Sequence, residues 1–305
     1  MDSIFDVIFR TGFIHTILRV STPIIFAGLA AVYSEKSGVI NVAIEGLMLI
    51  SAFICVIFSS LIGDAILALL IAVIINLIII FGFGFMVLKL SANSILVGLG
   101  INVLAQGGTV FGLYVLTGSK GNSIGINSLM LPTVDFPIIK NVPIIGEIFS
   151  GHNLLTYVAI LAVILSHILL FKTRIGIKIR AAGENPESLN SVGVKVNKTR
   201  YISLMISSIC ATLGGAFLSM GYMNGFTANM TSGRGFIGIA ANAMGNQLPL
   251  GTFLASLLFG AADGAASSLQ ILNVPAQFIQ MIPYITTILG ISIYSIIKTR
   301  KMRGI

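Results

Sequence analysis

Charged residues are scarce in this sequence. Asp, Glu, Lys and Arg make up 9% of its 305 residues and hydrophobic residues 56%, whereas soluble chains carry about 25% charged residues. This composition excludes a soluble globular domain. Cysteine and histidine are also rare, with two and three copies, and they show no ligand spacing. We therefore expect no disulfide framework, no metal site and no cofactor.

Motifs of catalysis are missing as well. The sequence contains no P-loop, no H-E-x-x-H and no G-x-S-x-G. The run GRGFIG at 233–238 fits the dinucleotide pattern G-x-G-x-x-G, but no β-strand is expected before it. We interpret its glycines as the sharp start of a membrane helix, whose free N–H groups and positive dipole end attract polar atoms. The chain is therefore not expected to be an enzyme.

The sequence is instead rich in apolar runs long enough to span a bilayer, which takes about 20 residues. They predict an all-α, polytopic membrane protein of about 8–10 transmembrane helices, in a single domain over 1–305. The predicted spans are 17–33, 46–62, 65–88, 94–117, 153–171, 201–223, 235–247, 250–270 and 277–297.

Positive charge is clustered beside these spans. Seven of the 18 Lys and Arg lie between Lys172 and Arg200, and four lie between Lys298 and Arg303. By the positive-inside rule, this places loop 172–200 and the C-terminus in the cytoplasm, and it argues against nucleic acid as a partner. The count of crossings then places loop 118–152 outside. It also requires the short span 235–247 to cross as a half-helix completed by irregular chain.

Two short segments resemble each other. SGVINVAI at 37–44 and SGRGFIGI at 232–239 each follow a Gly/Ala-rich span, and each opens another span. By the count of crossings they run in opposite directions. This pattern predicts inverted repeats, which place broken helices around a pathway near the midplane of the membrane.

Polar side chains inside the spans are candidates for that pathway, because a charge there is costly unless it faces a cavity or a polar partner. The uncharged amides suit a neutral solute better than an ion. For the two acids, Glu45 and Asp263, a role in lining the pathway and a structural hydrogen bond are equally open. Asp263 stands in a G-x-x-x-G run, which predicts close helix packing. The candidates are Asn41, Glu45, Asn102, Gln106, Asn242 and Asp263.

The cytoplasmic loop 172–200 contains a predicted helix over 186–192. Asn185 is a suitable N-cap and Gly193 a suitable stop. Leu189 and Val192 share one apolar face. A helix this short is not stable alone, so the exposed apolar face indicates that it docks against another surface.

Residues 180–222, RAAGENPESLNSVGVKVNKTRYISLMISSICATLGGAFLSMGY, resemble the permease subunits of bacterial ABC importers for simple sugars, nucleosides and branched-chain amino acids. The cytoplasmic loop of those permeases carries E-A-A, three residues, then G. Here Glu187-Ser188-Leu189 and Gly193 keep the spacing, with both alanines replaced. Three further stretches, at 33–53, 226–251 and 278–289, are similar to the sugar/nucleoside branch, the first above all to the shorter permease of nucleoside importers.

This resemblance implies a permease that forms the pathway for a nucleoside or simple sugar in the bacterial plasma (inner) membrane. The implied partners are a separate ATP-binding subunit that hydrolyses ATP, a second and longer permease, and an extracellular or periplasmic solute-binding lipoprotein. The loop helix would couple the permease to the ATP-binding subunit. The residues implied in coupling are Glu184, Asn185, Pro186, Glu187, Leu189, Val192 and Gly193.

Two alternatives stay open on sequence. One is a secondary transporter driven by an ion gradient, with Glu45 and Asp263 as coupling carboxylates; the other is a membrane-embedded assembly subunit. A docking helix favours the ABC importer, because a gradient-driven carrier has no use for one. The solute, and the choice between a homodimer and a heterodimer of permeases, also stay open.

Overall fold

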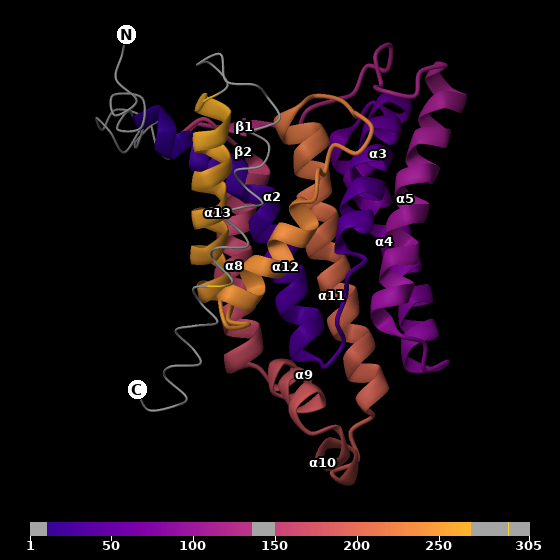
Figure 1. The fold of residues 1–305 in the computed structure, drawn as a ribbon, viewed down its shortest axis with the longest axis vertical. Helices are drawn as coiled ribbons and strands as arrows, with labels where there is room; N and C mark the ends of the chain where they lie inside the picture. Colours follow the sequence, from indigo (N-terminus) through magenta and orange to yellow (C-terminus); the bar gives the residue numbers. More distant parts are fainter. Residues whose placement is uncertain (1–10, 136–149, 270–291, 293–305) are drawn as a thin grey trace.

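The computed structural model describes residues 11–135, 150–269 and 292; apart from residue 292, the predicted span 277–297 and the C-terminus lie outside the described residues. The described chain is a bundle of long helices with one small pair of strands (Figure 1). In chain order the elements are α2 (Thr11–Lys36), α3 (Ile44–Ile62), α4 (Ala65–Leu88), α5 (Ser94–Thr117), β1 (Thr133–Val134), β2 (His152–Asn153), α8 (Leu154–Lys172), α9 (Arg174–Glu184), α10 (Pro186–Ser191), α11 (Val196–Phe217), the π-helical turn η1 (Leu218–Tyr222), α12 (Arg234–Met244) and α13 (Pro249–Leu269).

Seven of the described helices are long and apolar enough to cross a membrane. They coincide with predicted spans, which confirms an all-α polytopic membrane protein. α4 and α5 have the predicted bounds, whereas the first helix covers 11–36 instead of 17–33, because a helix can continue through the polar ends of a span.

The long helices alternate between two ends of the bundle, here called the α10 end and the β1 end after the elements found there (Figure 1). After η1, the chain returns irregularly over 223–233 into the bundle, where α12 begins. α12 has 11 residues and is therefore about 16 Å long, half the apolar thickness of a bilayer. The predicted crossing by a half-helix and irregular chain is thus confirmed.

The two units α2–α3–α4 and α11–α12–α13 exchange packing partners. α2 packs against α12 and α13, α11 packs against α3 and α4, and the two long helices pack against each other. In each unit the break contains a glycine with positive φ, +81° at Gly38 and +78° at Gly233. This reciprocal arrangement agrees with the predicted inverted repeats, and each unit buries its helices against the other.

The helices differ strongly in burial. α2, α3 and α11 are mostly buried, whereas α4 and α5 direct many large apolar side chains outward. Exposed apolar helix faces of this kind contact lipid or another membrane subunit.

Glycines bring the central helices together. A Cβ on Gly215 of α11 would overlap the carbonyl oxygen of Met48 and Oγ of Ser51 on α3. Gly260 of α13 contacts Ser21 of α2 in the same way, which confirms the close approach predicted from the G-x-x-x-G run.

We expect Gly215→Ala to destabilise the protein by about 1–3 kcal/mol, because the added methyl group overpacks the contact between α3 and α11. Thermal unfolding of the purified protein in detergent measures this. Gly100→Ala on α5 is the control: no described atom lies within 4 Å of the added Cβ, so stability should stay level or rise slightly. Equal unfolding temperatures for native protein and Gly215→Ala would contradict the packing.

Candidate functional site

Glu45, in the first repeat, caps the N-terminus of α12, a helix of the second repeat. It lies in the first turn of α3 and is 4% exposed. Its Oε1 accepts the N–H of Gly233 at 2.8 Å, and its Oε2 accepts the N–H of Gly235 at 2.7 Å. Gly233, the N-cap residue, has no side chain with which to cap the helix itself. The buried carboxylate therefore receives two backbone N–H groups that would otherwise lack partners, at the positive end of the α12 dipole.

Two predicted amides hold the start of α3. Asn41 Oδ1 accepts the N–H of Ala43 at 3.1 Å, while its Nδ2 donates to Ser207 Oγ of α11 at 3.3 Å. Asn102 Oδ1 accepts the N–H of Gly46 at 2.8 Å. Both side chains are buried, so α3, like the half-helix α12, begins inside the protein with polar side chains that accept its first N–H groups.

The second predicted acid holds α12 to its neighbour. Asp263 Oδ2 of α13 lies 3.1 Å from Arg234 Nη2, at the first residue of α12, and the two side chains are 21% and 19% exposed. Asp263 thus bonds across the α12–α13 contact and neutralises the arginine that follows the Gly233 turn.

A third acid, which the sequence analysis missed, holds the other end of α12. Glu35 Oε2 in the last turn of α2 accepts from Asn242 Nδ2 at 2.8 Å and from Gln247 Nε2 at 3.2 Å. Glu35 stands beside Lys36 at the end of a span, a position typical of an interfacial charge. The signal that could have found it is its place directly before the break at Gly38.

All three acids of the described spans therefore bind the segment 233–247. This use of the carboxylates argues against the gradient-driven carrier, which would need them for coupling ions. Gln106 differs from the other five pathway candidates. It is exposed on α5, and its side-chain amide has no hydrogen-bond partner among the residues that the structure describes.

The predicted helix of the polar loop is confirmed as α10. Asn185 Oδ1 accepts the N–H of Ser188 at 3.0 Å, and the chain leaves the helix through Gly193 at φ +78°. Val192 is 74% exposed. The expectation that Leu189 shares this exposed face is wrong, because the turn folds α10 back so that Leu189 is buried.

Leu189 packs against Ala182 of α9 and Val196 of α11. The turn that directs it inward is closed by the N–H of Val194, which donates to the carbonyl of Leu189 at 3.2 Å. The apolar side chain that α10 presents to solvent is therefore Val192, flanked by exposed polar residues such as Glu187.

The loop containing α10 is attached to the break between α2 and α3. Arg200 Nε donates to the carbonyl of Ser37 at 3.1 Å, and its Nη2 donates to the carbonyl of Ala182 at 3.3 Å. Gly183 lies against the backbone of Lys36 and Gly38, where a Cβ would not fit. A displacement of α9 and α10 would therefore act directly on the residues between Glu35 and Glu45.

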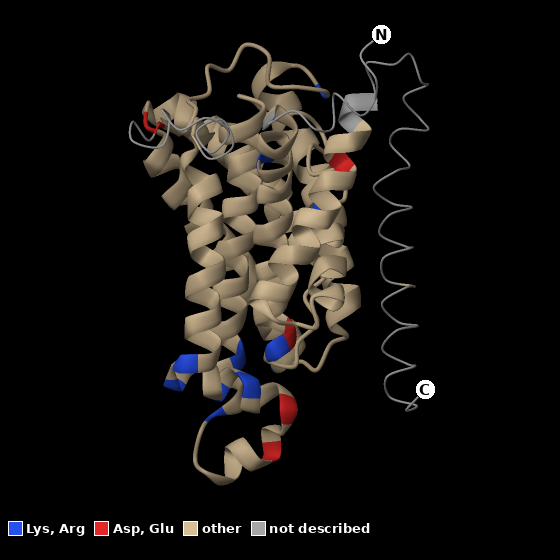
Figure 2. Ribbon diagram, turned by 90° about the vertical axis from the view of Figure 1, so that its left-hand side faces the viewer, with Lys and Arg blue, Asp and Glu red and all other residues tan. Residues whose placement is uncertain are grey.

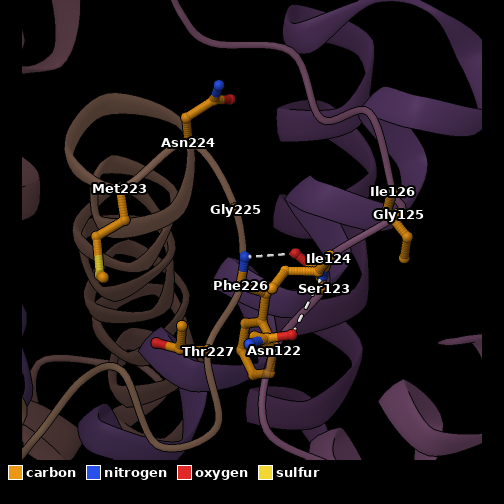
Figure 3. Close-up of a pocket in the computed structure, with 10 residues that line it drawn as sticks. All are labelled: Asn122, Ser123, Ile124, Gly125, Ile126, Met223, Asn224, Gly225, Phe226 and Thr227. Carbon is orange, nitrogen blue, oxygen red and sulfur yellow. Dashed lines mark hydrogen bonds between the residues drawn. The ribbon is translucent and has the colours of Figure 1, made fainter. Parts of the chain in front are cut away.

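At the β1 end, residues 122–126 and 223–227 line a groove of about 320 Å³, here called the loop groove (Figure 3). Ser123 joins its two sides: its N–H donates to the carbonyl of Phe226 at 2.8 Å, and its Oγ accepts the N–H of Phe226 at 2.9 Å. Residues 223–227, which line one side of the groove, are followed in the chain by the segment that leads to Gly233 and the start of α12. The groove and α12 are therefore connected through a few residues.

A bundle of two inverted units, each with a helix that begins inside the membrane domain, defines a broken-helix transport subunit. The chain belongs to the family of permease components of branched-chain amino acid transport systems, which it matches over residues 13–291.

Relatives of known name agree with this family. The chain is 34% identical to the guanosine ABC transporter permease NupQ of Bacillus subtilis, covering 89% of this chain and 88% of that one. It is 32% identical to the nucleoside ABC transporter permease NupC of Lactococcus lactis, covering 92% and 91%. A solved metal-chelate type ABC transporter in an inward-facing conformation shares the fold, with a TM-score of 0.54 at 16% identity over 91% of this chain and 84% of that one.

Asp263→Asn should lower stability by about 1.5–3 kcal/mol, the range for a lost hydrogen bond to a charged group. The exchanged pair Arg234→Asp with Asp263→Arg should recover a large part of this loss, since it restores the ion pair. Unfolding temperatures of the three proteins provide the measurement. An exchanged pair that is less stable than Asp263→Asn would show that the ion pair does not hold α12.

Proposed function

We propose that this chain is the membrane-spanning permease subunit of an ATP-driven importer and that its solute is a nucleoside. The observation that carries the proposal is α10, a capped helix that projects from one end of the bundle with an exposed apolar side chain. Together with the family, it supplies a place where a separate ATP-binding subunit acts. The whole of 1–305 would form one permease domain.

The charge distribution supports an orientation. Lys and Arg gather at the α10 end (Figure 2), and basic loops stay in the cytoplasm. The α10 end would thus face the cytoplasm of a bacterial cell and the β1 end the outside. Because α13 ends toward the β1 end (Figure 1), one further crossing by 277–297 would return the C-terminus to the cytoplasm.

The geometry of loop 172–200 supports coupling in two steps. Val192 and Glu187 would contact the ATP-binding subunit, while Leu189 holds α10 to the permease. Arg200 and Gly183 would then carry the movement to the end of α2 and the break before α3. Glu184, Asn185, Pro186 and Gly193 shape the helix and its ends, which makes them structural members of the coupling surface.

Two further partners fit the structure. Lactococcus lactis has two relatives of this chain, the nucleoside permeases NupC and NupB, the second 29% identical over 134 residues. This supports a second permease of different sequence, which would cover exposed apolar faces of α4 and α5. A solute-binding lipoprotein would contact the β1 end at the loop groove.

A neutral solute is consistent with the interior. The positive end of α12, which could attract a negatively charged group, is already occupied by Glu45. Asn41 and Asn102 use both ends of their amides in internal bonds, and Asn242 donates its Nδ2 to Glu35, so Gln106 is the pathway candidate whose whole side-chain amide is free among the described residues. A nucleoside, with hydroxyls and ring nitrogens and no charge, suits such a donor and acceptor.

We expect the double substitution Glu187→Arg with Val192→Arg to release the ATP-binding subunit and to lower uptake at least about tenfold, because charge is placed in a docking contact. The readout is co-purification of the ATPase with the tagged permease. Lys120→Glu, an exposed residue at the β1 end, is the control and should retain the ATPase. Full retention by the double variant would show that α10 is not the docking helix.

Leu189→Ala should behave differently, since this side chain is buried in the permease. We expect a loss of about 2–5 kcal/mol in local stability, seen as faster proteolysis between Lys172 and Arg200. If Leu189→Ala left proteolysis unchanged, the inward packing of α10 would be wrong.

Proteoliposomes with the complete complex should take up labelled adenosine or guanosine only with ATP, and unlabelled ribose or galactose should not compete. Ionophores that dissipate proton or sodium gradients should leave uptake unchanged. Uptake that follows an ion gradient would overturn the proposed function. Competition by ribose or galactose would show that the solute is a sugar and not a nucleoside.

A further inference from the structure

The charge of Glu45 is balanced in an unusual way. The carboxylate is buried, and no Lys or Arg of the described residues forms an ion pair with it; Arg234, beside its two bonding partners, is paired with Asp263. The groups that face the carboxylate belong to the backbone. It accepts two N–H groups at the start of α12, and it lies in the first turn of α3, so the positive ends of two helix dipoles stabilise it.

The surroundings of the carboxylate are shaped to hold α12 closely. A Cβ on Gly235 would lie 2.7 Å from Cα and 2.8 Å from the backbone nitrogen of Glu45. A Cβ on Gly238, one turn further, would lie 2.8 Å from the backbone nitrogen of Gly28 on α2. Because both glycines let backbones touch, α12 sits between α3 and α2, and the position of its first turn depends on the Glu45 carboxylate.

We propose that Glu45 is a built-in anion that positions α12 for transport. Its carboxylate fills an anion site made by the starts of α3 and of the half-helix α12, the kind of helix end that broken-helix transporters offer to anionic solutes. Glu45 is a positioning residue and does not touch the solute. The effect on uptake rests on the proposed function; the anion site itself is tested without it.

Chemical rescue tests the anion site directly. Glu45→Ala in the purified complex leaves a space between two N–H groups, which formate has the size and charge to enter. We expect a lowered unfolding temperature that rises again with millimolar formate and not with formamide, its neutral counterpart. Met48→Ala, a buried residue on the same helix, is the matched control: it leaves a cavity without the two N–H groups, and formate should not stabilise it.

Glu45→Gln removes the charge of the side chain and keeps its volume, so it tests the charge alone. The amide fills the same space but directs an N–H₂ group toward backbone N–H donors, so we expect a reduced amount of folded protein in the membrane or a lowered unfolding temperature. Uptake per folded complex should fall at least about tenfold, because the first turn of α12 loses charge-assisted hydrogen bonds, each of which shifts an equilibrium by about that factor or more. This variant decides the question if Glu45→Ala cannot be purified.

The outcomes are distinct. Formate that stabilises Glu45→Ala, with formamide and Met48→Ala showing no effect, supports the built-in anion. Formate without effect on Glu45→Ala, or with the same effect on Met48→Ala, overturns it, as does Glu45→Gln with native yield, stability and uptake. If the native complex fails to transport nucleosides, the proposed function fails while the formate result still decides the role of Glu45.

Discussion

One hydrogen-bonded carboxylate joins the two halves of this protein. Glu45 begins a helix of the first repeat, and its oxygens bind the N–H groups that begin the short helix of the second, 188 and 190 residues away in sequence. A half-helix cannot satisfy its first N–H groups from within itself, and lipid offers no partners for them. Without such a cap, α12 could not begin inside the membrane domain, and the irregular segment 223–233 would have no defined end.

The remaining architecture also depends on contacts between the two repeats. α2 packs on the half-helix α12 of the second unit, and α11 packs on α3 of the first, so neither unit can bury its core alone. Loop 172–200 contacts this region where Arg200 and Gly183 meet the chain between α2 and α3. In the proposed coupling, a movement of α10 would reach the start of α3 through these contacts, and the start of α12 through Glu45.

The sequence predicted features that depend on neighbours in the chain. The apolar runs gave the spans, Asn185 and Gly193 gave the bounds of α10 to within one residue, and the glycines at 233–238 gave a helix start inside the membrane. The sequence alone could not predict features that depend on residues brought together only by the fold. Whether Leu189 faces outward depends on a turn that returns α10 to α9, and whether Glu45 lines a pathway or caps a helix depends on where α12 begins. Glu35 escaped notice because only the fold brings Asn242 and Gln247 to it.

Amide hydrogen exchange at Gly233 and Gly235 tests the central contact most directly. In an isolated helix start these N–H groups lack partners and exchange rapidly. In the native complex, single-residue exchange followed by mass spectrometry should show both amides protected far more strongly than the amide of Asn229, an exposed residue of the preceding loop, because Glu45 accepts them in a buried site. Rapid exchange at both glycines would contradict the account, since the two repeats would then not be joined through Glu45.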